Sequence, residues 1–332
     1  MQFKKLTILL IVILFVVAGF ATSNTSQTIA ATEAPTAAAM SSDTIVWAFV
    51  PSENSQAVLD SAQGLADLVS AKTGLKIKTV VSTEFAGVVE AMCNGQAQIG
   101  ALNTFGYILA SSRKCADVGL VSVRNGSTTY RGQFITKADS GIKKITDLKG
   151  KTFCRPDPLS TSGWIIPSIT LKANGINPDT DLKQVVDVGG HDAVVENVYN
   201  GNCDAGSTFD DARSTILKKY PDVMEKVVVI EYSAAIPNDT VSFAPSFDAK
   251  QRAAITKAIV EIAADKANAD LIKKVYNWTG VSEAKDAFFN DFRQQLDSAG
   301  VKIDDLMPKK VATAEATMGA TDAAMMAATP AK

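Results

Sequence analysis

The sequence predicts an α/β protein with two lobes. Segments with the pattern of β-strands alternate along the chain with segments that have the pattern of helices, and one helix–turn–strand unit occurs twice. Between two low-complexity ends lie about 270 residues, which is more than one compact core usually holds. Alternating strands and helices favour parallel sheets covered on both faces, and ligands of such sheets bind beyond the carboxyl ends of the strands.

The alternation begins with a strand, a helix and a second strand. Residues 44–50 (TIVWAFV) form the first strand, residues 55–74 a helix that ends at Gly74, and residues 75–81 the next strand. One face of the helix carries Val58, Ala62, Leu65 and Val69. Further strand candidates are residues 118–123, 131–136, 151–154, 183–188 and 226–232.

The repeated unit is GVVEAMCNGQAQIGAL, residues 87–102, and AVVENVYNGNCDAGST, residues 193–208. Six residues recur without a gap: Val88, Val89, Glu90, Asn94, Gly95 and Gly100 as Val194, Val195, Glu196, Asn200, Gly201 and Gly206. Asn-Gly is a common helix exit, so shared local rules explain some matches, but the ungapped run favours structural equivalence. Beyond the two strands lie Asn103 and Thr104 in one copy, and Thr208, Asp210 and Asp211 in the other. If the lobes face one another, these side chains meet across the gap.

A third segment, CRPDPLSTSGWIIP, follows the strand at residues 151–154 and brings small, hydroxyl-bearing residues to the start of a helix. These residues are Ser160, Thr161, Ser162 and Gly163. The first four amides of a helix have no intrahelical partner and carry a positive partial charge, so the segment either caps the helix or binds an anion. Because the segment follows a strand, we expect it to line the same gap between the lobes, which favours anion binding over capping alone.

The two ends of the chain have patterns of their own. Residues 1–21 combine two lysines, an apolar run and small residues near its end, the order of a secretory signal peptide, and the alternative is an uncleaved anchor. Residues 22–42 have the composition of a flexible linker, and residues 311–332 that of a low-complexity tail or a short Ala-rich helix. We expect an exported protein, in the periplasm or at the cell surface.

Composition and motifs argue against several classes of function. A net charge of −2 argues against nucleic-acid binding. The sequence lacks GxSxG, HExxH and P-loop motifs, and its single histidine leaves little capacity for acid–base catalysis, so we do not expect an enzyme. The four cysteines have no CxxC spacing, which disfavours zinc and favours two disulfides, with three possible pairings. We expect neither a metal nor a cofactor.

Four stretches resemble one known family: residues 83–92 (TEFAGVVEAM), residues 127–168 with the run DPLSTSG, residues 189–201 (GGHDAVVENVYNG) and residues 236–241 (IPNDTV). The family is that of the periplasmic phosphate-, phosphite- and phosphonate-binding proteins that feed ABC transporters, and the likeness spans residues 44–303. The resemblance implies a type II periplasmic binding protein fold. In that fold, two α/β lobes joined by two crossover strands close on the ligand.

With this fold, the expected boundaries are 43–135 plus 240–310 for lobe I and 136–239 for lobe II. The chain is expected to cross to lobe II near residues 134–137 and to return near residues 236–241. The helices after Asp248 should pack on lobe I, since they carry an apolar stripe that must be buried: Ile255, Ile259 and Ile262.

The resemblance also implies that hydroxyls and amides of the STSG run hold the ligand's oxygens: Ser160, Thr161 and Ser162, with Gly163 allowing close approach. The family often has tyrosine where this chain has Phe85, and can have tyrosine near Leu102. Both departures remove a hydroxyl, so we expect a less polar pocket. Further candidate contacts are Ser127, Thr128, Thr129, Tyr130, Asn103 and Thr104. Trp164 and Phe49 are expected in the core.

Titratable residues complete the expected site. The family's histidine and the acid after it fall on His191 and Asp192, and the acid beyond the second lobe's strand falls on Asp210 or Asp211. As alternatives, His191 caps or packs a helix and Asp210 is an N-cap. An anion beside Asp210 makes sense if the ligand carries a proton, since phosphoryl groups have a second pKa of about 6. Sulfate has no such proton, so we expect it not to bind, and because of the less polar pocket at Phe85 and Leu102 we expect a small phosphonate or phosphite to bind more tightly than phosphate.

We expect one disulfide in each lobe, Cys93 with Cys115 and Cys154 with Cys203, because each pair falls in one copy of the alternating pattern and a bridge across the lobes would resist closure. The expected function is that of an extracytoplasmic, monomeric binding protein that captures a small phosphorus oxyanion for the permease of an ABC importer. The alternatives are a sensor subunit that binds a similar oxyanion, and a phosphonate or phosphate-ester hydrolase.

Overall fold

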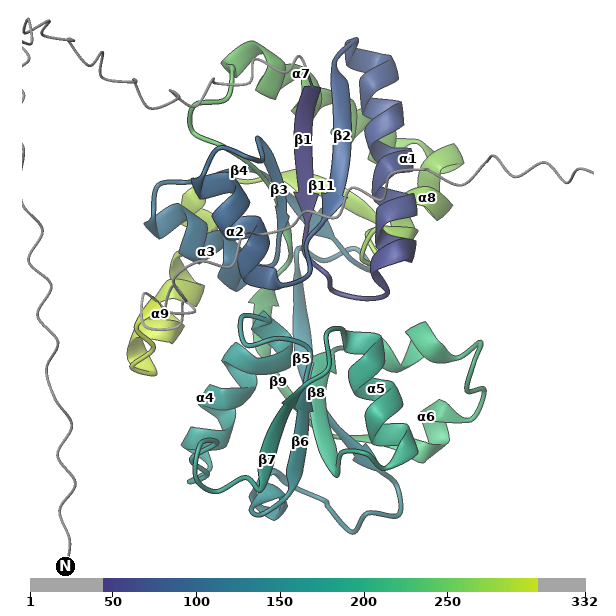
Figure 1. The fold of residues 1–332 in the computed structure, drawn as a ribbon, viewed down its shortest axis with the longest axis vertical. Helices are drawn as coiled ribbons and strands as arrows, with labels where there is room; N and C mark the ends of the chain where they lie inside the picture. The colour runs from purple at the N-terminus through teal and green to yellow at the C-terminus, as the bar shows by residue number, and fades with distance from the viewer. Residues whose placement is uncertain (1–43, 304–332) are drawn as a thin grey trace, which may run out of the picture. The chain divides into compact units, whose positions relative to one another are not determined.

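The computed structural model describes residues 44–303 (Figure 1), all within a single structural unit. The predicted signal, linker and tail segments, 1–21, 22–42 and 311–332, lie outside the described residues. Within residues 44–303, no helix is both long enough and apolar enough to cross a membrane. The chain forms two sheets, and we call each sheet with its helices the first or the second lobe.

The first lobe is built on a six-stranded sheet in the order β11-β4-β10-β3-β1-β2. Its strands are β1 (Thr44–Phe49), β2 (Lys76–Val81), β3 (Ile99–Leu102), β4 (Asp117–Val123), β10 (Thr240–Phe243) and β11 (Gly280–Glu283). β1 runs parallel to β2 and β3, whereas β10 and β11 run antiparallel to their neighbours. The prediction of parallel pairing is correct for the first three strands. It is wrong for β10 and β11, and β10 enters from the second lobe without a crossover helix between neighbouring strands.

The second lobe has a five-stranded sheet in the order β7-β6-β8-β5-β9. Its strands are β5 (Thr129–Lys137), β6 (Thr152–Arg155), β7 (Gln184–Asp187), β8 (Ala205–Phe209) and β9 (Val227–Pro237). β5 pairs with β9 from Thr129 onward. The chain therefore enters the second lobe between Val123 and Thr129, earlier than the expected crossing at residues 134–137, because this ladder already holds Thr129 in the second sheet. It returns between Pro237 and Thr240.

Helices cover both sheets: α1 (Ser55–Thr73), α2 (Phe85–Cys93), α3 (Thr104–Ser112), α4 (Ile166–Ala173), α5 (His191–Asn200), α6 (Val223–Lys226), α7 (Ala249–Ala264), α8 (Ala269–Lys274) and α9 (Asn290–Ser298). α1 begins at Asn54, whose side chain accepts from the amide of Ala57, and ends at Gly74 in the left-handed conformation. α7 begins at Asp248, which caps two amides, and packs on α1. Its predicted apolar stripe is buried: Ile255, Ile259 and Ile262. The helices after Asp248 thus belong with the first sheet.

The repeat is structural. Its two copies form α2 with β3 and α5 with β8, a helix followed by a strand inside each sheet. A Cβ at Gly100 would lie 2.4 Å from Met92 Sδ of α2, and one at Gly206 would lie 2.6 Å from Val194 Cγ1 of α5. Both copies therefore need glycine for the same reason, because the helix of the unit rests on the strand at that point.

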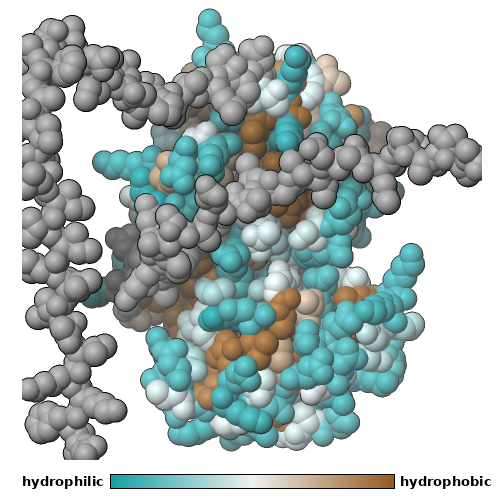
Figure 2. Space-filling view, in the orientation of Figure 1, coloured by the Kyte–Doolittle hydropathy of each residue, from teal (hydrophilic) through white to brown (hydrophobic). Residues whose placement is uncertain are grey.

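Each lobe contains one disulfide, Cys93–Cys115 in the first and Cys154–Cys203 in the second, as predicted. Each bridge links neighbouring elements of its own lobe, so neither restrains the movement of one lobe against the other. Phe49 is fully buried in the core of the first lobe, and Trp164 packs against Phe153 in the second, as expected. The face shown in Figure 2 is mostly hydrophilic, with apolar side chains in patches between polar ones.

Candidate functional site

A small cavity lies where side chains of the two lobes meet. Its walls are Val50, Ser52, Phe85, Asn103, Arg124, Tyr130, Ser160, Thr161, Ser162, His191, Phe209, Asp239 and Tyr276. The space open to the centre of a water molecule is about 10 Å³, close to what one water molecule needs. An oxyanion, which is larger than a water molecule, would therefore touch the walls of the cavity on every side. The lining combines hydroxyl groups, one buried arginine and several apolar side chains.

The hydroxyl segment reaches the cavity as a helical turn, Thr161–Ile165, that continues into α4. Thr161 Oγ1 accepts hydrogen bonds from Asn103 Nδ2 at 2.9 Å and from the amide of Phe105 at 3.0 Å. Because these bonds occupy its acceptor sites, the Thr161 hydroxyl has only its proton left to offer, and it can act only as a donor toward a ligand. Ser160 Oγ accepts from the amide of Gly163 at 3.2 Å, so part of the segment also serves as a cap.

Gly163 does not line the cavity. A Cβ at this position would lie 2.4 Å from Cδ of Pro156. The glycine is therefore required by the packing of the helical turn against the loop before it, and the expected close approach of a ligand is not its role in this geometry.

His191 is buried and lies against Phe209, with 4.9 Å between the ring centroids. Its Nε2 is 3.2 Å from Ser160 Oγ, and its Nδ1 has no hydrogen-bond partner among the described residues. Burial, with a smaller contribution from the positive charge of Arg124, lowers the pKa of His191 to about 3. The imidazole is therefore neutral at physiological pH and serves as a hydrogen-bonding group without charge.

The ion pair of Arg124 and Asp239 is the main feature that the sequence analysis missed. The Arg124 Nη2 donates to Asp239 Oδ2, and the two side chains are only 11% and 10% exposed. The guanidinium lies over the rings of Tyr130 and Phe209, 5.1 and 5.6 Å from their centroids. Its Nε is buried without a partner among the described residues, so a donor is left for a ligand. The positions offered a signal, since Arg124 directly follows a strand and Asp239 belongs to the IPND run.

Glu53 adds a second carboxyl near this pair. It accepts from Asn277 Nδ2 at 3.3 Å and is half-buried. Burial raises the pKa of Glu53 to about 7, with opposing effects from Arg124, which lowers it, and from Asp192 and Asp239, which raise it. At neutral pH this carboxyl therefore carries only part of its charge.

The helices of the first lobe that point at the cavity are capped from the second lobe. Asp157 Oδ2 accepts from the amide of Phe85, the first residue of α2, at 3.2 Å, and Thr161 accepts from the amide of Phe105 at the start of α3. The residues at the N-cap positions of these helices, Glu84 and Asn103, make no side-chain capping bond. Burial raises the pKa of Asp157, against its two bonds from backbone amides. Closure of the lobes thus completes two helix caps.

Further bonds join the lobes beside these caps. Asn103 Nδ2 also donates to the carbonyl of Leu159 at 2.8 Å, and the amide of His191 donates to the carbonyl of Ser52 at 2.9 Å. The cavity is therefore enclosed by a closed arrangement of the lobes.

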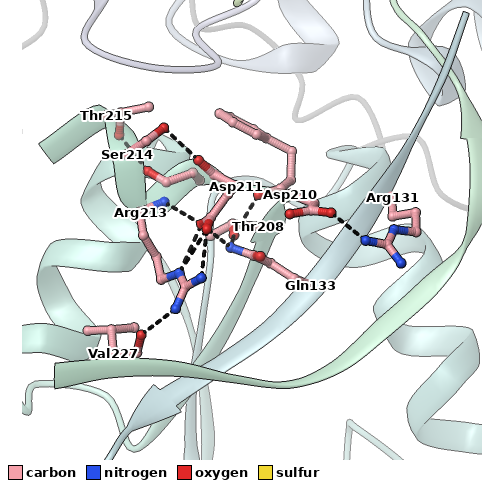
Figure 3. A network of polar contacts seen from close by, with 11 residues as sticks. Arg131, Gln133, Thr208, Asp210, Asp211, Arg213, Ser214, Thr215 and Val227 are labelled. Atoms are coloured by element: carbon pink, nitrogen blue, oxygen red, sulfur yellow. Dashed lines mark hydrogen bonds and ion pairs between the residues drawn. The ribbon is translucent and has the colours of Figure 1, made fainter. Parts of the chain in front are cut away.

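Asp210 and Asp211 lie outside the small cavity, in a neighbouring groove of about 600 Å³. Asp210 pairs with Arg131 at 2.8 Å, and Asp211 is bound by Arg213 at 2.6 Å and by Gln133 Nε2 at 3.1 Å (Figure 3). Burial alone would raise the pKa of Asp211, but the hydrogen bonds of Arg213 and Gln133 lower it. Both carboxylates therefore already have partners within their own lobe.

The structure brings seven of the expected contacts to the cavity: Phe85, Asn103, Tyr130, Ser160, Thr161, Ser162 and His191. Others lie elsewhere: Ser127, Thr129, Asp210 and Asp211 line the groove, and Gly163, Thr104, Thr128, Asp192 and Leu102 line neither space. The Thr104 hydroxyl instead donates to the carbonyl of Pro237, and Leu102 is fully buried. Missed residues are Val50, Ser52, Arg124, Phe209, Asp239 and Tyr276. Among the described residues, no group of three or more His, Cys, Asp or Glu side chains is placed to hold a metal.

Comparison with known protein families identifies the family of this chain. Residues 47–289 match the family described as "ABC transporter, phosphonate, periplasmic substrate-binding protein". The chain belongs to this family. The phosphonate-binding family consists of periplasmic binding proteins rather than enzymes, in agreement with the expectation from sequence.

Two relatives show how similar the sequence is to curated proteins of this kind. The chain is 32% identical over 178 residues to the phosphate-import protein PhnD of Mycolicibacterium smegmatis, covering 51% of this chain and 56% of the relative. It is 26% identical over 175 residues to the phosphonates-binding periplasmic protein of Escherichia coli, covering 51% and 52%. The chain thus spans about half the length of the curated relatives it matches.

Solved structures of phosphonate-binding proteins share the fold. A binding protein component of an ABC phosphonate transporter from Pseudomonas aeruginosa superposes with a TM-score of 0.72 at 20% identity, covering 77% of this chain and 86% of that chain. PhnD1 from Prochlorococcus marinus in complex with methylphosphonate gives a TM-score of 0.69 at 14% identity, covering 78% and 99%. The predicted two-lobed α/β fold of a periplasmic binding protein is therefore confirmed.

Proposed function

We propose that this protein captures a small phosphorus oxyanion, a phosphonate or phosphite, outside the cytoplasm and delivers it to the permease of an ABC importer. The observation that carries the proposal is the enclosed cavity that places Arg124, Asp239 and the hydroxyls of residues 160–162 around one small space. The membership of the phosphonate-binding family supports the proposal, as do relatives named for phosphate import and for phosphonate binding.

The donors in the cavity suit an anion with several oxygens. The Thr161 proton and the unpaired Nε of Arg124 are available, and the serine hydroxyls beside Thr161 add further donors. Donors from the start of a helix add a positive partial charge. The arginine corrects the expectation that neutral dipoles alone would hold the ligand, although its charge is balanced by Asp239.

The acceptors in the cavity favour phosphorus over sulfur. Asp239 lines the cavity, and its Oδ2 is paired with Arg124. Oδ1 is therefore the oxygen that remains to accept a hydrogen bond from a protonated ligand. A phosphoryl group, with a second pKa of about 6, still carries a P–OH near neutral pH, whereas a sulfate oxygen beside this carboxylate is repelled. The role that the sequence analysis gave to Asp210 is therefore proposed for Asp239.

The apolar side of the cavity influences which fourth substituent on the phosphorus atom is favoured. Val50, Phe85 and Phe209 offer no hydrogen bond to a fourth oxygen. Leaving that oxygen without a partner costs roughly 1 to 3 kcal/mol, so P–H or P–CH₃ suits this side better. We propose that methylphosphonate and phosphite bind about tenfold more tightly than phosphate.

Calorimetry of the full chain with methylphosphonate, phosphite, phosphate and sulfate tests the proposal. We expect the first two to bind most tightly and sulfate to give no measurable heat. With the detection limit taken as the wild-type affinity for sulfate, Asp239→Asn should narrow the ratio of the methylphosphonate and sulfate affinities by at least about tenfold, because it removes the repulsive carboxylate. Asp210→Asn is the matched control and should change each affinity by less than about threefold. Sulfate as the tightest ligand, or a larger effect from Asp210 than from Asp239, contradicts the proposal.

A further inference from the structure

The small cavity and the large groove share only three lining residues: Arg124, Tyr130 and Phe209. The two spaces differ greatly in size, with about 10 Å³ open to a water centre in the cavity and about 600 Å³ in the groove. These three side chains, which we call the wall, are therefore what separates a closely fitted anion site from a space large enough for an organic substituent.

We infer that the wall determines ligand specificity, by excluding phosphonates whose substituent is larger than a methyl group. The inference rests on the proposed function, because it concerns which members of that ligand class bind. A head group that fills the cavity leaves no room there for a chain. A longer chain would have to enter the groove, and the wall lies across that route.

The wall is held by contacts that oppose its opening. Arg124 lies over both aromatic rings and is tied to Asp239 by the buried ion pair. Phe209 packs on the other side against His191, and at the end of β8 it pairs with Gly132 of β5. Displacing Arg124 would separate a buried pair of charges, and displacing Phe209 would disturb the histidine that contacts Ser160.

The groove beyond the wall is suited to a substituent if the wall is opened. Its lining mixes polar and apolar side chains and comes from both lobes, including Thr129 and Ala235 of the second lobe and Lys273 and Asn277 of the first. Its two carboxylates are paired with arginines, so a neutral alkyl chain would not lie beside an unpaired carboxylate there. A smaller residue at position 209 would join the two spaces without removing a donor to the anion.

The test compares methylphosphonate with n-propylphosphonate by calorimetry of the full chain. In the wild type, we expect n-propylphosphonate to bind about 100-fold more weakly, since a closely fitted pocket rejects extra methylenes. Phe209→Ala should reduce this ratio by about tenfold or more, as the chain gains access to the groove. Phe209→Leu, which keeps apolar bulk, should reduce the affinity ratio less. This variant also allows the test to be made if the alanine variant does not fold.

Tyr232→Ala is the matched control, because it removes an aromatic ring that also lies under an arginine, Arg131, but is not part of the wall. It should leave the ratio unchanged. Equal affinity for the two phosphonates in the wild type, or an unchanged ratio in both Phe209 variants, overturns the inference and leaves the proposed function standing. Failure of the wild type to bind methylphosphonate, phosphite or phosphate defeats the proposed function and this inference together.

Discussion

Two arginine–aspartate pairs, whose arginines lie on either side of Tyr130 in the sequence, border the two neighbouring spaces of the cleft. Arg124 pairs with Asp239 and lies over Tyr130 and Phe209, while Arg131 pairs with Asp210 and lies over Tyr232. The chemical groups are the same in both cases. The exposure is not, since the side chains of the first pair are 11% and 10% exposed and those of the second 50% and 26%.

This difference in burial decides what each pair can do. An exposed ion pair contributes little to stability, because water screens it and two long side chains must be ordered. A buried pair costs much to desolvate, and each charge depends on the other once it is inside. Loss of either Arg124 or Asp239 should therefore disturb both the shape and the charge of the cavity. Loss of Arg131 or Asp210 should change the groove lining with little effect on the rest of the structure.

The largest expected effect separates the two arginines. Arg124→Ala leaves Asp239 buried without a cation and should lower the free energy of unfolding by about 3 to 5 kcal/mol. Arg131→Ala should lower it by less than about 1 kcal/mol. Urea unfolding of both variants measures the difference. The double variant Arg124→Leu with Asp239→Asn should recover much of the loss, because no unpaired charge remains. Equal effects of the two single substitutions would show that burial does not distinguish the pairs.

A second prediction concerns the carboxyl beside the buried pair. The pKa of Glu53 is about 7 in the folded protein against an ordinary value of 4.5. A carboxyl with a raised pKa gives stability that is full below about pH 4.5 and is lost as the pH rises through 7. Between pH 5 and pH 8, the wild type should therefore lose up to about 3 kcal/mol relative to Glu53→Gln.

Thermal or urea unfolding at several pH values measures this loss. Glu283→Gln, at an exposed position of the edge strand β11, is the control and should follow the wild type across the whole range. The same pH dependence in the wild type and in Glu53→Gln would mean that Glu53 is not the group that titrates.

The smallest effect is expected from a carboxylate whose partners are backbone amides instead of an arginine. Asp157 caps α2 across the cleft, so Asp157→Ala should weaken the closed arrangement by about 1 kcal/mol. This corresponds to about fivefold weaker binding of methylphosphonate, although Asp157 does not line the cavity.

Asp248→Ala provides the comparison, because Asp248 caps α7 within one lobe. This substitution should lower stability by a similar amount and leave the affinity for methylphosphonate unchanged. If both aspartates changed affinity equally, the effect of Asp157 would be one of general stability and not of closure.

The sequence by itself determined the α/β class, the repeated helix–strand unit and the hydroxyl segment, and the two copies of the alternating pattern then selected the disulfide pairing. These features depend on local rules: a glycine where a helix rests on a strand, an apolar stripe at helical spacing, and hydroxyls at a helix start. For this reason Ser160, Thr161 and Ser162 were found from the pattern, whereas His191 was implied by the family resemblance.

Only the tertiary structure decided which acid faces the cavity and where the chain crosses between the lobes. Asp210 and Asp239 are both acids near strand ends, and nothing local distinguishes them. Asp210 is drawn to Arg131 on its own sheet, while Asp239, in the return crossing, meets an arginine that lies 115 positions earlier in the chain. The burial of that pair arises from the packing of two lobes and two aromatic rings, Tyr130 and Phe209, and no sequence window contains both partners.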